Sequence, residues 1–278
     1  MKLCMFSPKH RDLERGWPGR IEGDRVIQLA AQTLQSFFTG GGTAREHDEF
    51  ALADVVFRAP VLHPPAIRDF YAFEQHVRTA RASRGLDVPD EWYEIPVFYF
   101  SNAAAVFGPD DEIPYPSGTA ELDYELELAA VIGAEGQIAG FTVMNDWSAR
   151  DLQRAEMKVG LGPSKGKDFA TSLGPVVVTV DEFDGTTGTM IARVNGEERS
   201  RGDVGDMHHP WRAIRDHAAL NTRLLPGDIL GSGTVGTGCI LELGDGRWLK
   251  PGDVVELEIE GIGVLTNVVG LPLEPVRS

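Results

Sequence analysis

The pattern of apolar and polar positions predicts strands along most of the chain. Several stretches alternate between the two classes, as half-buried strands do, or stay apolar over a short run, as fully buried strands do. Tight turns are expected at Gly23-Asp24, at Asn195-Gly196 and at Gly261. Strands are predicted in this way at residues 21–27, 122–132, 139–144, 175–180, 192–198 and 254–269.

Helices are fewer, and each stands apart from the others along the chain. They are predicted at residues 30–38, 69–82, 147–158 and 209–221. Because strands dominate and the helices are isolated, we expect an α+β, mainly β fold rather than a doubly wound parallel sheet. Consecutive prolines after His63 stop regular structure. The sequence therefore predicts a small N-terminal domain at residues 1–63 and a larger domain at 64–278.

Composition narrows the classes of partner. The formal net charge of −16 repels polyphosphates, so nucleic acid is not an expected partner. No apolar run is long enough to span a membrane, and no signal peptide precedes the charged residues near the N-terminus. Cys4 and Cys239 are the two cysteines, far apart and outside any CxxC pair. They predict reduced thiols and a cytoplasmic protein without a thiolate zinc site.

Carboxylates at alternate positions provide the first chemical signal. Asp123, Glu125 and Glu127 share a face if residues 122–128 form a strand, and the residues after them are wholly apolar. Buried carboxylates on one face repel one another unless a cation neutralises them, and hard divalent cations prefer carboxylate oxygens. Asp146 follows a second apolar strand and could join them. Its alternative role is to cap the following helix.

The same alternation occurs at residues 256–260, where Glu256, Glu258 and Glu260 would share a face. This second segment is not followed by an apolar run, and we interpret it as a strand with an acidic face toward water. Residues 122–128 could likewise form a solvated strand that binds no metal, because acidic strands commonly face water.

Three stretches resemble the fumarylacetoacetate hydrolase family. They are residues 122–127 (LDYELE), 144–153 (MNDWSARDLQ) and 166–171 (GKDFAT), and residues 69–71, 75–76, 231–234 and 241–243 also fit. The matches run in order from about residue 67 to 270. This resemblance implies a β-sandwich-like roll as the catalytic domain, usually in a homodimer, and a small keto acid as the substrate.

The resemblance also implies roles for individual residues. The metal ligands correspond to Asp69, Glu125, Glu127 and Asp146, and Mg²⁺ is the expected ion, with Mn²⁺ or Ca²⁺ as alternatives. The catalytic pair corresponds to His76 and Glu242, and the oxyanion-stabilising groups to Arg150, Gln153 and Lys167. Tyr71, Tyr99 and Thr234 match substrate-contacting positions. The arginine that holds the substrate carboxylate in the family has no clean match here.

These residue types suit hydrolysis of a carbon–carbon bond in a β-diketo acid. A cation accepts enolate charge, a histidine oriented by a carboxylate activates water, and cationic or amide donors hold an oxyanion. Two alternatives remain at this stage. A hydratase, decarboxylase or enol–keto isomerase would use the same metal site, and a metal-binding scaffold would use it without catalysis. Taken alone, His76 could be a surface residue, and Arg150 and Gln153 could be a solvated helix face.

Overall fold

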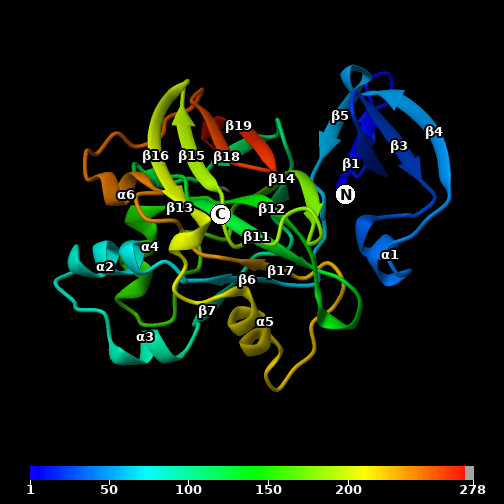
Figure 1. Ribbon diagram of the computed structural model, residues 1–278. Coiled ribbons are helices and arrows are strands. Elements are labelled where there is room, and N and C mark those ends of the chain that lie inside the picture. Colours follow the sequence, from blue (N-terminus) through cyan, green and yellow to red (C-terminus); the bar gives the residue numbers. More distant parts are fainter. Residues whose placement is uncertain (273–278) are drawn as a thin grey trace, which may run out of the picture.

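The computed structural model describes residues 1–272, and the N-terminal part of them forms a group of antiparallel strands at one end of the molecule (Figure 1). Thr33 caps the short helix in this group, because its hydroxyl accepts from the Ser36 backbone N–H. The elements are β1 (Lys2–Pro8), β2 (Trp17–Glu22), β3 (Arg25–Leu29), α1 (Leu34–Thr39), β4 (Glu46–Ala51), a 3₁₀ turn (Leu52–Asp54) and β5 (Val55–Arg58).

These strands continue into the largest sheet of the described residues. Its order is β4-β3-β2-β1-β14-β12-β11-β17-β6-β7, with β5 on β1 and β8 on β14. Its other members are β6 (Ile67–Phe70), β7 (Phe98–Ser101), β8 (Val106–Phe107), β11 (Leu126–Ile132), β12 (Ile138–Asp146), β14 (Thr171–Thr179) and β17 (Ile229–Gly231). Sheet pairing thus crosses the predicted boundary at residue 63, because Lys2 lies opposite Val178. The division into two domains stays a prediction.

A second sheet has the order β16-β15-β18-β19-β9, and its strands contact β11, β12 and β14 of the first. Its members are β9 (Glu112–Tyr115), β15 (Thr189–Val194), β16 (Glu197–Asp203), β18 (Val254–Ile259) and β19 (Gly263–Pro272). A short pair joins β10 (Leu122–Asp123) to β13 (Ser148–Ala149). The helices are α2 (Glu74–Ala82), α3 (Asp90–Glu94), α4 (Arg150–Met157), α5 (Trp211–Ala219) and α6 (Ile240–Leu243), with 3₁₀ turns at Ala134–Gly136 and Val204–Asp206.

The core lies on both faces of the large sheet, which explains the apolar run after Glu127. On β11, Leu128 and Ala130 point into one buried cluster, while Ala129 and Val131 point into another. A strand covered on both faces needs apolar residues at successive positions. The mainly β, α+β architecture expected from the pattern is therefore confirmed. Among residues 1–272, no helix has the length and apolar character needed to cross a membrane.

Several local expectations can be compared with the structure. The hairpin at 192–198 forms as predicted, and both turn residues, Asn195 and Gly196, have the positive φ that such a turn requires. The predicted helix at 69–82 begins only at Glu74, because Asp69 lies on β6 between β17 and β7. Asp69 and His76 therefore do not share a helix face.

Two further corrections affect the candidate site. The strand predicted at residues 122–132 is interrupted, so Glu125 lies between β10 and β11 rather than within a strand. Glu242 lies between Leu241 and Leu243, an alternation that is typical of a strand, but residues 240–243 form the short helix α6. Asp123 supports this helix, because its carboxylate accepts from the backbone N–H groups of Ile240 and Leu241.

Candidate metal and active site

Neighbouring strands of the large sheet place three acids side by side. The order β12-β11-β17-β6 carries Asp146 at the end of β12, Glu127 on β11 and Asp69 on β6. Gly231 lies between them on β17, in register with Asp69. A Cβ at Gly231 would lie 2.7 Å from Asp69 Oδ1 and 2.9 Å from Glu127 Oε2. The missing side chain therefore leaves the space in which the carboxylates meet.

Asp69, Glu125, Glu127 and Asp146 form one buried acidic cluster. Each offers an oxygen atom within 4.8 Å of the others, and all four residues are buried. The Oδ1 atoms of Asp69 and Asp146 have no hydrogen-bond partner in the described part of the chain. Buried, unpartnered carboxylate oxygens that converge in this way fit a hard divalent cation. The cluster predicted from sequence is thus brought together, although Asp123 is not part of it.

Two cationic side chains border the cluster. Lys167 Nζ donates to Glu125 Oε2 at 2.5 Å and also to Asp146 Oδ2. Arg150 donates through Nη2 to Glu125 Oε1 at 2.7 Å and through Nε to Asp123 Oδ2 at 2.8 Å. Five buried carboxylates therefore face two cations, and a divalent metal ion would remove most of the excess negative charge.

The directions of the pKa shifts show which buried carboxylates have no cation close enough to neutralise their charge. Burial and the neighbouring carboxylates raise the pKa of Glu127 well above its usual range, and burial and Asp146 do the same for Asp69. Burial also raises the pKa of Asp146, with Lys167 opposing it. Burial would raise the pKa of Glu125 too, but Arg150 and Lys167 outweigh that effect and its pKa is lowered. Asp69 and Glu127 are thus the acids that most need a further cation.

The helix N-cap alternative for Asp146 does not hold. The residue before α4 is Ala149, whose methyl side chain cannot cap the helix. Asp146 instead accepts a hydrogen bond from the Tyr99 hydroxyl at 2.6 Å, in addition to its contact with Lys167. Tyr99 comes from β7, so it closes the cluster from the strand beyond β6.

His76 and Glu242 form a second buried group beside the cluster. His76 Nδ1 on α2 lies 2.8 Å from Glu242 Oε2 on α6, although the ring is not aligned for a hydrogen bond. The Tyr71 ring packs edge-on against the imidazole, with centroids 5.3 Å apart. Burial raises the pKa of Tyr71 to about 12. His76 is therefore a buried residue with a carboxylate partner rather than a surface residue.

The remaining predicted residues lie in the same region. Gln153 accepts from Arg150 Nη1 at 3.1 Å through its Oε1 atom. Thr234 is buried, and its hydroxyl lies 3.4 Å from Glu127 Oε1, so it contacts a carboxylate of the cluster. Gly233 donates its backbone N–H to Glu127 Oε2 at 3.0 Å. The segment after β17 thus supports the cluster with polar contacts.

A cleft of about 350 Å³ borders the cluster on the side of Lys167 and Tyr99. Tyr99 and Lys167 both contact Asp146, so the cleft lies next to the cluster. Its lining residues are Tyr99, Phe100, Ser101, Asn102, Leu161, Pro163, Ser164, Lys167 and Asp168.

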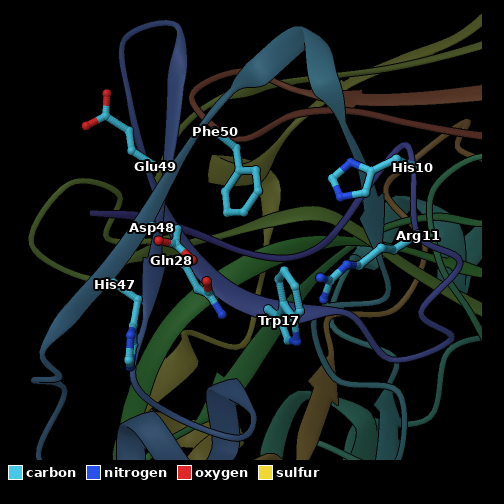
Figure 2. Close-up of a pocket in the computed structure, with 8 residues that line it drawn as sticks. All are labelled: His10, Arg11, Trp17, Gln28, His47, Asp48, Glu49 and Phe50. Atoms are coloured by element: carbon cyan, nitrogen blue, oxygen red, sulfur yellow. The ribbon is translucent and has the colours of Figure 1, made fainter.

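A larger hollow of about 580 Å³ lies on the N-terminal strands, and none of the predicted site residues lines it. Figure 2 shows Trp17 and Phe50 with Arg11 close to the indole, whose ring centroid lies 5.2 Å from the guanidinium carbon. The acidic and histidine residues of this hollow are exposed. Size alone therefore does not identify the chemical site here.

Sequence reasoning did not identify the contacts of three residues that border the site. Asp123 was expected to share a face with Glu125 and Glu127, but its carboxylate binds Arg150 and the start of α6. Gly231 was noted only within a matching stretch, although it provides the space between strands. Cys239 was predicted only to be a reduced thiol, yet its sulfur lies 3.6 Å from Glu242 Oε2. The apolar neighbours of Cys239 give no local signal, because the contact depends on how α6 packs.

Comparison with known proteins agrees with this geometry. The family model described as fumarylacetoacetate (FAA) hydrolase C-terminal matches residues 66–270. Oxaloacetate tautomerase FAHD2A of Bos taurus is 34% identical over 304 residues, which cover 97% of this chain and 91% of that protein. Oxaloacetate tautomerase YisK of Bacillus subtilis is 28% identical over 271 residues, covering 90% and 84%.

Solved structures show the same fold over almost the whole chain. Fumarylacetoacetate hydrolase from Exiguobacterium antarcticum is similar with a TM-score of 0.80 and 27% identity, covering 97% of this chain and 99% of that one. The 5-carboxymethyl-2-hydroxymuconate delta-isomerase from Mycobacterium smegmatis has a TM-score of 0.76, 28% identity and the same coverage. The chain therefore belongs to the fumarylacetoacetate hydrolase family.

Proposed function

We propose that the protein is a divalent-metal-dependent enzyme that forms the enolate of a small 2-oxo acid, and that it interconverts the enol and keto forms of an oxaloacetate-like substrate. The observation that carries this proposal is the acidic cluster, in which Asp69 and Asp146 each keep an unpartnered buried oxygen beside Lys167. When bound there, Mg²⁺ or Mn²⁺ would chelate the oxo acid and accept the negative charge of its enolate.

The side chains around the cluster suit a proton transfer next to that charge. His76 Nδ1 faces Glu242, which leaves Nε2 as the atom that takes the proton from carbon. The Glu242 carboxylate lies next to Nδ1 and would stabilise the protonated form of the ring. Lys167 and Arg150 lie where a developing negative charge would need donors. Returning the proton to the enolate oxygen completes a tautomerisation without any water being consumed.

Two relatives that cover most of the chain are named oxaloacetate tautomerases, which supports tautomerisation as the first choice. Hydrolysis of a carbon–carbon bond in an acylpyruvate or fumarylpyruvate is the second candidate. It is favoured by the buried His76–Glu242 pair, because the same imidazole could take its proton from water instead of from carbon. In both reactions the substrate is a small keto acid held by the acidic cluster.

The test compares both reactions in the same preparation. The decay of enol-oxaloacetate and the cleavage of acetylpyruvate and fumarylpyruvate are followed by absorbance, with Mg²⁺, with Mn²⁺ and with a chelator. We expect metal-dependent acceleration of tautomerisation. His76→Ala should reduce it by roughly 10²–10⁴-fold, the usual cost of removing a general base. His47→Ala is the matched control, because this exposed histidine lines the separate N-terminal hollow.

The outcomes separate the candidates. Cleavage of an acylpyruvate without accelerated tautomerisation would select the hydrolase. Neither reaction, together with no binding of Mg²⁺ or Mn²⁺ by calorimetry, would contradict the proposal as a whole. If His76 and Glu242 act as one unit, the double variant should be scarcely slower than His76→Ala alone.

A further inference from the structure

The His76–Glu242 pair has a third neighbour of different chemistry. Cys239 immediately precedes α6, and its sulfur lies 3.6 Å from Glu242 Oε2. One ligand atom from each of His76, Cys239 and Glu242 lies within 4.8 Å of the other two. The three side chains come from two separated parts of the chain and meet in the interior.

Two buried polar atoms in this group lack hydrogen-bond partners in residues 1–272. They are His76 Nδ1 and Glu242 Oε1, from side chains that are 6% and 2% exposed. Such orphaned atoms are rare in proteins, because an unsatisfied buried group costs free energy. The group thus offers an imidazole nitrogen, a sulfur and a carboxylate, with spare capacity for ligation.

The spacing suits a tetrahedral ion. Zinc bonds of about 2.0 Å to nitrogen and oxygen and about 2.3 Å to sulfur imply ligand separations of roughly 3.3 Å for nitrogen–oxygen and about 3.5 Å for sulfur–oxygen. The observed separations are 2.8 Å between His76 Nδ1 and Glu242 Oε2 and 3.6 Å between Cys239 Sγ and Glu242 Oε2. Both separations lie within about half an ångström of the tetrahedral values, and the third pair, His76 and Cys239, offers ligand atoms within 4.8 Å of each other.

We propose that His76, Cys239 and Glu242 form a second metal site, specific for thiophilic divalent ions such as Zn²⁺, and that occupancy of this site inhibits the enzyme. The ion takes the cysteine as a thiolate, and the thiol proton leaves to solvent when the metal–sulfur bond forms. The acidic cluster has oxygen ligands alone and selects hard cations, whereas sulfur and imidazole select softer ones. The two sites therefore discriminate between ions by ligand type.

The ion would inhibit the enzyme because it would bind the two side chains that are proposed to transfer the proton. It would hold Nδ1 of His76 and the carboxylate of Glu242, so the carboxylate could no longer stabilise a protonated imidazole. This part rests on the proposed function, in which His76 accepts a proton. Metal binding itself does not depend on it, and the two parts are tested by separate measurements.

The binding test uses Co²⁺ as a spectroscopic substitute for Zn²⁺, in the presence of saturating Mg²⁺. A cobalt–thiolate bond gives a near-ultraviolet charge-transfer band that oxygen ligands do not give. We expect this band at one equivalent of Co²⁺ in the wild type and in Cys4→Ala, and its loss in Cys239→Ser. Cys4 is the matched control, because it is the other buried free cysteine. Absence of the band in folded wild type, or its loss in Cys4→Ala, would overturn the site.

The inhibition test measures the Zn²⁺ concentration that halves the Mg²⁺-dependent rate. Cys239→Ser should raise this concentration at least tenfold and leave the rate without Zn²⁺ within a few-fold of wild type. Equal inhibition of both proteins, relieved by added Mg²⁺, would place Zn²⁺ in the acidic cluster and overturn the inhibitory role. If no substrate is turned over, the cobalt spectrum still decides whether the site exists.

Discussion

Two segments of this protein have the same alternation of acidic and apolar residues but opposite surroundings. Residues 122–127 place Asp123, Glu125 and Glu127 in the interior, where each is at most 4% exposed. Residues 256–260 place Glu256 and Glu258 at partly exposed positions of β18, with Leu257 and Ile259 in the core. Alternation alone therefore does not establish the surroundings of acidic residues, since Asp123 lies outside the cluster that holds Glu125 and Glu127. The covering elements decide whether an acidic segment becomes a binding site or a solvated surface.

The difference arises from neighbours that are distant in sequence. Glu125 contacts Arg150 and Lys167, both of which are buried. Glu258 instead pairs with Arg193 on the adjacent strand at 2.7 Å, with both side chains about one-third exposed. Removing one partner of a buried ion pair costs much stability, because the other charge stays buried without compensation. Solvent weakens an exposed ion pair, so its loss costs little.

The largest expected effect comes from Glu125→Gln. The change removes the buried carboxylate that Lys167 and Arg150 share and leaves each with one anionic partner, Asp146 and Asp123 respectively, so we expect a loss of about 3–5 kcal/mol in the free energy of unfolding. Binding of Mg²⁺ or Mn²⁺ should also be lost. Urea unfolding and calorimetry measure the two effects. Unchanged stability and metal binding would show that the buried segment behaves like the exposed one.

Glu127→Gln should separate metal binding from metal-free stability. Glu127 has carboxylate neighbours but no cationic side chain among its hydrogen-bond partners in the described residues, so its removal relieves repulsion in the metal-free protein. We expect metal-free stability at least equal to that of wild type. The wild type should gain about 2.7 kcal/mol at a metal concentration of about 100 times Kd, and the variant should gain nothing. Thermal unfolding with and without Mn²⁺ provides the measurement. A clear loss of stability in the metal-free variant would contradict the prediction.

Gly231→Ala tests the space between the acids. The added methyl group meets Asp69 Oδ1 and Glu127 Oε2 within van der Waals distance, so both carboxylates must move. We expect metal affinity to fall by roughly 10–100-fold, as for other changes that misorient ligands, at a stability cost of about 1–3 kcal/mol. A titration that gives wild-type affinity would mean that the ligands need no such space.

Glu258→Gln should have the smallest effect. Loss of its ion pair with Arg193 should change the free energy of unfolding by about 0.2–1 kcal/mol, with less effect at high salt. Metal affinity and catalytic rate should remain those of the wild type. A large loss of either would mean that exposure is a poor guide to the role of an acidic strand.

The sequence predicted best those features that depend on neighbouring residues in the chain. The Asn195-Gly196 turn depends on the conformational preferences of its own two residues, and it forms as predicted. The apolar residues after Glu127 correctly indicated burial, because both faces of β11 are covered. The family resemblance brought Asp69 into the cluster, although the surrounding pattern predicted a helix.

The errors concern residues whose role depends on packing between distant segments. Asp69 lies in a strand because β17 and β7 pair on either side of it, and no neighbouring residue reveals that pairing. Asp123 was grouped with the metal ligands by its spacing, but Arg150 and the start of α6 bind its carboxylate. Gly231 and Cys239 likewise acquire their importance only when separate strands and helices meet.

The pairing of β1 with β14 has a consequence for how the chain is made. Synthesis on the ribosome begins at the N-terminus, so Leu3 emerges long before its partner Val177 is translated. During that interval, the edge of β1 that will pair with β14 stays open. Nascent N-terminal segments should therefore require protection from aggregation until the middle of the sequence has emerged. Pausing of translation before residue 180 would lengthen this exposed period, whereas a pause near the C-terminus would not.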